Sequence, residues 1–280
     1  RSELVQRLRD EIKNYQSPSR ESRAQSMEYV VLGRANLLVS RIALGAYGLQ
    51  YVENDEAAAE LVTMAYQGGI NFFDTARHKP LSEVRLGKAI QSIQRQHIIL
   101  ASKSTAPDGA TLQADIEASL DAMNCDYIDL YQIENDVFVP TEKSPDDLYK
   151  VLRKYQENGK IKHMGFVTES PELAQIAIAS DLYETVQLPL NILSPELNIE
   201  LAQTCEQKDI GFIAMQPLCG GVFRNIPLAY GFLRQYENVI PLWGTRLPEE
   251  LQQILYFESH PPVIDDKFKE EAKHTRLLFS

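Results

Sequence analysis

The sequence predicts one α/β domain folded as a closed (β/α)8 barrel, and three observations support this prediction. Eight short apolar runs, rich in β-branched and aromatic residues, recur along the chain. Longer stretches with helical periodicity separate these runs, a pattern typical of parallel strands covered by helices. The length of 280 residues, with 44% hydrophobic content, suits a single large core.

The eight runs are the predicted strands of the barrel, in chain order. Each is short and is apolar on both faces, as expected of strands buried between an inner core and an outer layer of helices. They comprise residues 41–44, 70–73, 97–102, 127–131, 161–166, 185–188, 210–214 and 238–242.

Two of the helical stretches carry recognisable capping residues. Residues 55–69, "DEAAAELVTMAYQGG", begin with Asp55 as the predicted N-cap and end at two glycines. Residues 111–124, "TLQADIEASLDAMN", begin with Thr111 in the same role. Each helix follows one strand and precedes the next, so each strand and its helix form one unit of the barrel.

Upstream of the first barrel strand, the sequence predicts two further features. Residues 28–41, "EYVVLGRANLLVSR", contain two short β runs around "GRAN" and predict a hairpin that plugs the N-terminal face of the barrel. Apolar residues recur at helical spacing through residues 2–15, and a polar linker follows at 16–26. The extra N-terminal helix either packs on the barrel wall or docks onto a protein partner, while residues 27–280 form the barrel domain.

Composition excludes several classes of function. The net charge of −11 and the pI near 5.0 leave no basic stripe for nucleic acid. Cys125, Cys205 and Cys219 are far apart and form no Cys-x-x-Cys pair, so neither disulfides nor a metal site is expected. No apolar run approaches the roughly 18 residues of a membrane span. We therefore expect a cytoplasmic protein that binds a small-molecule substrate and no membrane.

In a (β/α)8 barrel, the residues just past the strand ends face the active site. Near the middle of the chain these positions hold two acids and two lysines, and a glycine-bearing loop and an arginine follow later. The candidates are Gly45, Ala46, Tyr47, Asp74, Thr75, Lys79, Lys103, Ser104, Glu134, Asn135, Val167, Thr168, Gln187, Gln216, Pro217, Gly220, Gly221, Trp243, Gly244, Thr245 and Arg246.

Six blocks in order resemble the aldo-keto reductases: "VLGRANLLVSRIALGAYGL", "GINFFDTA", "SEVRLGKAI", "DYIDLYQIEN", "GKIKHMGF" and "IAMQPLCGG". The resemblance runs from about Met27 to the C-terminus. It is greatest to a subgroup that often ends in a cysteine-rich, ferredoxin-like [4Fe-4S] tail, and this sequence lacks such a tail. The resemblance implies NADPH-dependent reduction of a carbonyl, in which a tyrosine protonates the oxygen with help from a lysine, an aspartate and a histidine.

Only half of that catalytic tetrad carries over to this sequence. The aspartate is Asp74 and the lysine is Lys103, whereas the tyrosine position holds Lys79 and the histidine position holds Glu134. The four side chains sum to zero formal charge, which predicts a compensating salt bridge between Lys79 and Glu134. Family members that reduce carbon–carbon double bonds also carry a glutamate in the histidine's place, but they keep the tyrosine.

Three interpretations of this altered tetrad follow. In the first, Lys79 or Glu134 has a shifted pKa and acts as the proton donor, so the chain reduces a carbonyl or an unsaturated carbonyl. In the second, Lys79 forms a Schiff base with a substrate carbonyl, giving lyase or isomerase chemistry. In the third, reduction is lost and the barrel binds a ligand or a partner.

Three neighbouring residues are assigned to the substrate pocket, namely Tyr47, His78 and Asn135. His78 either turns into the site or remains a solvated loop residue, which is the simpler interpretation. Tyr47 lies beyond the first barrel strand and is either a proton donor or a wall of the pocket.

The resemblance also implies an NADPH site along the later strands. The late loop "WGTRLPEEL" places Thr245 and Arg246 ahead of a predicted helix, where a 2′-phosphate would meet positive charge. The assigned cofactor residues are Gly45, Asp74, Thr168, Gln187, Gln216, Pro217, Leu218, Gly220, Gly244, Thr245 and Arg246.

Overall fold

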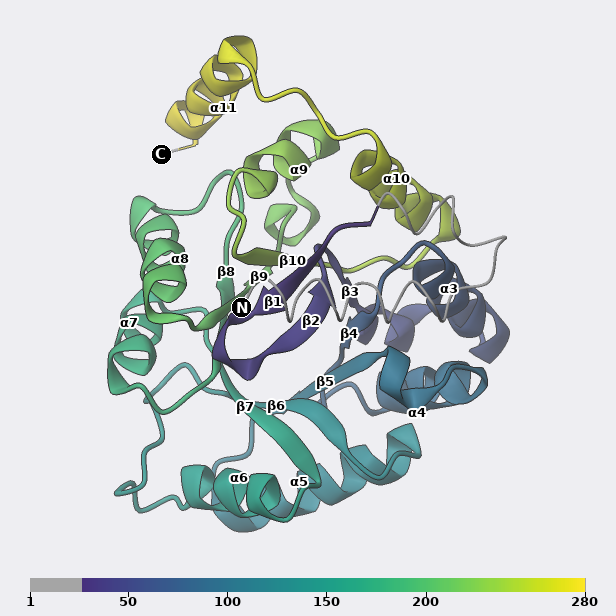
Figure 1. Ribbon diagram of the computed structural model, residues 1–280, viewed down its shortest axis with the longest axis vertical. Coiled ribbons are helices and arrows are strands. Elements are labelled where there is room, and N and C mark those ends of the chain that lie inside the picture. The colour runs from purple at the N-terminus through teal and green to yellow at the C-terminus, as the bar shows by residue number, and fades with distance from the viewer. Residues whose placement is uncertain (1–26, 280) are drawn as a thin grey trace.

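A computed structural model describes residues 27–279 of the chain and shows a closed barrel of parallel strands (Figure 1). Around the barrel the strands follow chain order, and the last strand pairs with the first to close the ring. The barrel strands are β3 (Ala43–Gly45), β4 (Phe72–Asp74), β5 (Ile99–Ser104), β6 (Ile128–Glu134), β7 (Ile161–Val167), β8 (Thr185–Pro189), β9 (Gly211–Met215) and β10 (Val239–Trp243). Each predicted strand overlaps one of these, so the (β/α)8 barrel is confirmed.

Helices surround the barrel (Figure 1). Their apolar faces and the outward side chains of the strands form the larger of two hydrophobic clusters. The helices are α3 (Asp55–Gln67), α4 (Pro80–Ala89), α5 (Gly109–Met123), α6 (Leu148–Glu157), α7 (Pro171–Ser180), α8 (Glu196–Lys208), α9 (Ile226–Arg234), α10 (Pro248–Ser259) and α11 (Asp266–Leu278). The helix predicted for residues 2–15 lies outside the described residues.

Both predicted N-cap residues were wrong, because the true N-caps lie one and three residues earlier in the chain. The N-cap of α3 is Asn54, whose side chain accepts a hydrogen bond from the Ala57 amide. The N-cap of α5 is Asp108, which accepts from the Thr111 amide. An N-cap residue keeps an extended backbone and satisfies an amide further along the first turn. Asp55 instead lies inside the first turn of its helix.

The predicted hairpin is present and closes one end of the barrel. Strand β1 (Tyr29–Leu32) pairs antiparallel with β2 (Leu37–Ser40), and in Figure 1 the two strands lie across the barrel. Leu32 and Val39 join the smaller hydrophobic cluster, whose other buried members come from the inner faces of the barrel strands. The turn is held by the amide of Arg34, which donates to the carbonyl of Asp209 just before β9.

Gly33, in the turn of this hairpin, tests how closely the plug is packed. Its φ is 47°, and an added Cβ would lie 2.2 Å from the backbone nitrogen of Gly211. We expect Gly33→Ala to lower the free energy of unfolding by about 2 kcal/mol or more, measured by denaturant titration. Gly220 has a similar φ of 69° with open space around it. Gly220→Ala is therefore the control, since it carries the cost of a side chain at positive φ without a steric clash. If both variants lose the same free energy of unfolding, Gly33 is not closely packed.

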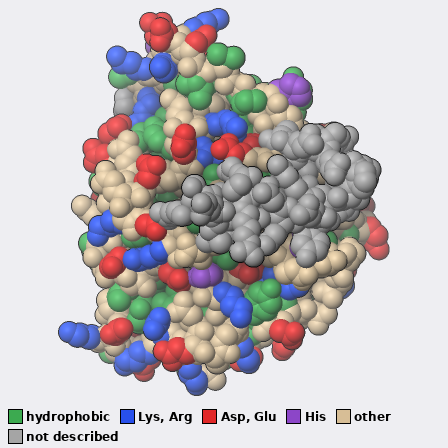
Figure 2. Space-filling model, in the orientation of Figure 1, with side chains coloured by type: hydrophobic (Ala, Val, Ile, Leu, Met, Phe, Trp, Pro, Cys, Tyr) green, Lys and Arg blue, Asp and Glu red, His purple; other side chains and the backbone are tan. Residues whose placement is uncertain are grey.

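Acidic and basic side chains are intermixed over the face seen in Figure 2, without a patch of one sign. Over residues 27–279, no helix is both long enough and apolar enough to cross a membrane. Within the same range, no group of three or more His, Cys, Asp or Glu side chains is arranged to hold a metal ion.

Candidate active site

Polar side chains at one end of the barrel continue the inner face of the strands. Along a strand, alternate residues point to the same side. Phe72 belongs to the inner cluster, and two residues later Asp74 ends β4 on the same side. In the same way, Lys103 follows Ala101 on β5, and Gln132 follows Leu130 on β6. The site is therefore the layer directly above the apolar core of the barrel.

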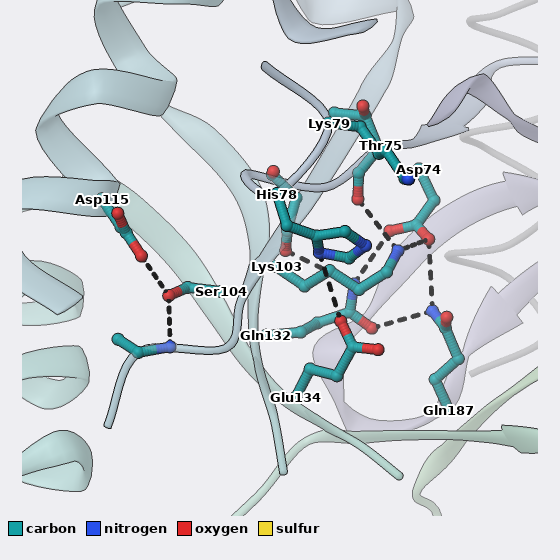
Figure 3. A network of polar contacts seen from close by, with 12 residues as sticks. Asp74, Thr75, His78, Lys79, Lys103, Ser104, Asp115, Gln132, Glu134 and Gln187 are labelled. Carbon is teal, nitrogen blue, oxygen red and sulfur yellow. Dashed lines mark hydrogen bonds and ion pairs between the residues drawn. The ribbon is translucent and has the colours of Figure 1, made fainter. Parts of the chain in front are cut away.

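Asp74 is the centre of this layer (Figure 3). Its side chain is fully buried. Lys103 Nζ lies 2.6 Å from Asp74 Oδ2 and 2.9 Å from the carbonyl oxygen of Thr75. Gln132 Nε2 donates to Asp74 Oδ1 at 2.9 Å, and Gln187 Nε2 lies 3.3 Å from Asp74 Oδ2. Residues from four strands thus meet at one carboxylate, and the predicted pair of Asp74 and Lys103 is brought together.

Gln132 was not among the predicted site residues. A signal was present, because Gln132 interrupts an apolar strand two residues before Glu134 and must share its face. Its carbonyl oxygen accepts from Gln187 Nε2 at 3.1 Å, which links the two amides beside Asp74.

Glu134 lies beside this network and faces His78 (Figure 3). Glu134 Oε2 lies 3.7 Å from His78 Nδ1, and within residues 27–279 this buried oxygen has no hydrogen-bond partner. Burial raises the pKa of the Glu134 carboxyl above its ordinary range, against the opposing charge of Lys103. Burial and the charges of Lys103 and Lys79 lower the pKa of His78. Both shifts favour the neutral forms, so the pair presents a protonatable carboxyl next to an imidazole.

The predicted salt bridge between Lys79 and Glu134 does not form. Lys79 Nζ donates instead to the Tyr51 hydroxyl at 2.7 Å. The reason is local, because Lys79 is the N-cap residue of α4 and Pro80 begins the helix. In this turn the preceding residue, His78, points toward Glu134, so its side chain is both 42% exposed to solvent and turned toward the site.

The loop that carries His78 is held in place by a buried glutamate, Glu83, on helix α4. The amide of Arg77 donates to the carbonyl of Lys103 at 2.8 Å, and its guanidinium pairs with Glu83. Glu83 Oε1 accepts from the hydroxyls of Ser102 and Ser119, each at 2.7 Å. These contacts, which the sequence did not indicate, hold His78 over the site.

The residues assigned to the cofactor just after β7, within β8 and just after β9 have partners within the protein. Thr168 Oγ1 donates to Asp136 Oδ1 at 2.7 Å. Gln187 is occupied by Asp74 and Gln132, as described above. Gln216 Nε2 donates to Glu169 Oε1 at 2.9 Å and so joins the loops that follow β9 and β7. Because the Nε2 group of Gln187 already donates to Asp74 and Gln132, a contact between Gln187 and the carboxamide of a nicotinamide would use the side-chain oxygen of Gln187.

The loop after β9 offers open space. Gln216 and Cys219 have positive φ values of 57° and 53°. Gly220 and Gly221, which follow, also have positive φ values, of 69° and 90°. Pro217 and Leu218 lie within this turn. An added Cβ on Gly220 or Gly221 would meet nothing within 4 Å.

The loop after β10 meets the end of β3 closely. A Cβ on Gly45 would lie 3.0 Å from Gly244 Cα, and one on Gly244 would lie 2.8 Å from the Tyr47 hydroxyl. Thr245 is buried, and its hydroxyl has no hydrogen-bond partner among residues 27–279. Arg246 lies over the ring of Tyr51, with 4.6 Å from Cζ to the ring centroid.

Asn135 uses its side chain within its own loop. Its Oδ1 accepts from the amides of Val137 at 2.8 Å and Phe138 at 3.0 Å. Its role in the predicted substrate pocket is thus to shape the loop after β6.

These residues fit a nicotinamide dinucleotide. The orphan hydroxyl of Thr245, the guanidinium of Arg246 and the open turn at Gly220 supply donors, positive charge and room for phosphate groups. They lie after the last two strands, on the same side of the barrel as Asp74.

Comparisons with known proteins all point to aldo-keto reductases. A model of the aldo/keto reductase family matches residues 41–228. A probable aldo-keto reductase 1 from Glycine max is 29% identical, over 69% of this chain and 60% of that protein. The chain thus spans about 60% of the length of this curated relative.

Solved structures share the fold at low sequence identity. The holo form of the aldo-keto reductase AKR11C1 from Bacillus halodurans has a TM-score of 0.76 and 18% identity, covering 89% of this chain and 96% of that one. A putative aldo-keto reductase from Pseudomonas aeruginosa has a TM-score of 0.74 and 22% identity, covering 83% and 94%. Since the family model matches well over half of the sequence, the chain belongs to the aldo/keto reductase family.

Proposed function

We propose that this protein is an NADPH-linked oxidoreductase that reduces a small carbonyl or unsaturated carbonyl substrate with an altered tetrad. The observation that carries the proposal is the Asp74–Lys103 ion pair, buried at the mouth of the barrel next to Glu134. A cation and a protonated carboxyl at one site can together stabilise the negative charge that develops on a reduced carbonyl oxygen.

In this mechanism Glu134 is the proton donor. Its raised pKa keeps the carboxyl proton available nearer to neutral pH than in an ordinary glutamate. His78 Nδ1 faces the same carboxyl at 3.7 Å and can return a proton to Glu134 Oε2 from solvent, because the imidazole is partly exposed. Lys79 has no part in this step, since its ammonium bonds to Tyr51.

Lys103 acts on the substrate oxygen by charge. Its Nζ is oriented by Asp74 and by the carbonyl of Thr75, which leaves one ammonium hydrogen for the substrate. NADPH, when bound, supplies the hydride, and we propose that Gly45, Gln216, Pro217, Leu218, Gly220, Gly244, Thr245 and Arg246 hold it, with Gln187 and Thr168 near the nicotinamide. Asp74 serves this site by fixing Lys103 and both glutamines.

The Schiff-base alternative lacks geometric support. A lysine that attacks a carbonyl needs its amine inside the site and free of partners. Lys79 is half-buried at the rim and donates to Tyr51, whereas Lys103 is ion-paired with Asp74. We also propose a reducing compartment such as the cytosol, because Cys125, Cys205 and Cys219 are free thiols.

A cofactor titration tests the proposal directly. We expect saturable binding of NADPH, followed by nicotinamide fluorescence, and weaker binding of NADH because only NADPH carries the phosphate that Arg246 would contact. Oxidation of bound NADPH on addition of a small aldehyde or a cyclic enone would support reduction. No binding at high micromolar cofactor would overturn the proposal and favour a ligand-binding barrel.

A further inference from the structure

Lys79 and Tyr51 form a pair at the rim of the barrel, next to the turn that carries His78. Lys79 Nζ lies 2.7 Å from the Tyr51 hydroxyl oxygen and 5.2 Å from the centre of its ring. Tyr51 is half exposed, at 50%. Lys79 directly follows His78, and its charge contributes to the lowered pKa of that histidine. The pair is therefore open to solvent and electrostatically close to the site.

Among residues 27–279, both members of this pair keep hydrogens that donate to no other group. An ammonium carries three hydrogens, and Lys79 spends one on the oxygen of Tyr51. Because that oxygen accepts from Lys79, the phenolic hydrogen is free to donate, and within residues 27–279 it has no acceptor. An ammonium and a hydroxyl that point outward from one contact can bind two oxygens of one anion.

Two cations, Lys79 and Arg246, lie against Tyr51. Arg246 lies over the ring of Tyr51. Among the described residues, no carboxylate forms an ion pair with the side chain of Lys79 or of Arg246. Within the part of the chain that the structure describes, both cations therefore remain available to an anionic group.

The segment that carries Tyr51 is held in place by α4. Arg85 is buried and donates from Nη1 to the carbonyls of Leu49 at 2.7 Å and Val52 at 3.0 Å, on either side of Tyr51. The amide of Leu81 donates to Gln50 Oε1 at 3.1 Å. Since Lys79 caps the same helix, both members of the pair are fixed to one element, as a preorganised binding site requires.

We propose that Tyr51 and Lys79 bind a carboxylate at the far end of the substrate, so that the protein selects carbonyl compounds that carry a negative charge. This inference rests on the proposed reduction of a carbonyl. It also explains why a lysine occupies the tyrosine position of the family, because the residue there serves recognition at the rim and leaves proton donation to Glu134.

Two aldehydes of similar size test the selection. We expect kcat/KM for 4-carboxybenzaldehyde to exceed that for 4-methylbenzaldehyde by about tenfold or more, since a hydrogen bond to a charged group contributes roughly a factor of ten in binding. Tyr51→Phe keeps the ring beneath Arg246, and Lys79→Met keeps the length of the side chain. Each variant should lower the ratio of the two kcat/KM values by about tenfold. Lys150→Met is the matched control, because Lys150 is exposed and pairs with Asp147, a residue of its own helix cap.

Binding without turnover separates this inference from the proposed function. Calorimetry with benzoate should show binding to the unmodified protein and loss of affinity by about tenfold in Tyr51→Phe and Lys79→Met. If neither aldehyde is reduced but benzoate binds in this pattern, the anion site stands and the proposed reduction fails. If both aldehydes are reduced with equal kcat/KM, or if the two variants bind benzoate as well as Lys150→Met does, the anion site is overturned.

Discussion

Replacing Lys103 by methionine is expected to lower the free energy of unfolding by about 3–5 kcal/mol and to abolish reduction. Asp74 is fully buried, and Lys103 is the one cation bonded to it among residues 27–279. Without the lysine, Gln132 and Gln187 still donate to the carboxylate, but its charge is left uncompensated in a buried site. Urea titration measures the first loss, and NADPH oxidation with an aldehyde measures the second.

The double variant Asp74→Asn, Lys103→Met separates charge from packing. Removing both charges eliminates the unpaired carboxylate, so the double variant should be more stable than Lys103→Met alone. Activity should stay absent in both, because the cation that faces the substrate oxygen is missing. If Lys103→Met is as stable as the unmodified protein, the ion pair contributes nothing to folding and the account of Asp74 as a buried centre is wrong.

Replacing Glu134 by glutamine is expected to lower kcat by about 10²–10⁴-fold while NADPH still binds. General acid catalysis contributes an acceleration of this size, and a carboxamide has no comparable proton to give. Glutamine keeps the shape of the side chain, and Glu134 Oε2 has no hydrogen-bond partner within residues 27–279 whose loss would disturb the fold. Steady-state kinetics under saturating NADPH measure the effect.

The pH dependence of reduction provides the second test of Glu134. Since the pKa of its carboxyl is raised, the protonated form persists to higher pH than in an ordinary glutamate. The rate should be highest below this pKa and fall by about tenfold for each pH unit above it. In Glu134→Gln this decline should disappear. A decline that persists unchanged in the variant would assign the proton to another group.

The fold could be predicted because it depends on patterns that repeat. Strands such as β9 and β10 are apolar on both faces, and the helices along the chain show regular spacing, so eight units were apparent. The hairpin that ends at Ser40 followed from its two short β runs in the same way. The caps at Asn54 and Asp108 were missed because several neighbouring residues can serve and only the backbone decides among them.

The site was predictable where strands carry it and not where a loop does. Asp74 and Lys103 end strands, so alternation places them inside the barrel. His78 and Lys79 lie in a tight turn, where a rotation of one residue exchanges the side chain that faces Glu134. The buried contact of Arg77 with Glu83, together with Pro80 at the start of α4, determines this rotation, and neither position is informative by spacing alone.

The three side-chain bonds that meet at Asp74 have a consequence for how this chain can change over evolutionary time. Asp74 and Lys103 connect strands, so their loss harms folding whether or not any reaction is selected. Glu134 Oε2 has no hydrogen-bond partner among residues 27–279 and lies 3.7 Å from His78 Nδ1, so we expect the fold to tolerate exchanges at these two positions. A lineage that acquires a new substrate will therefore vary at the second pair and retain the first. Persistence of Asp74 and Lys103 in a sequence then reports on the barrel, and the identities at 78, 79 and 134 report on the chemistry.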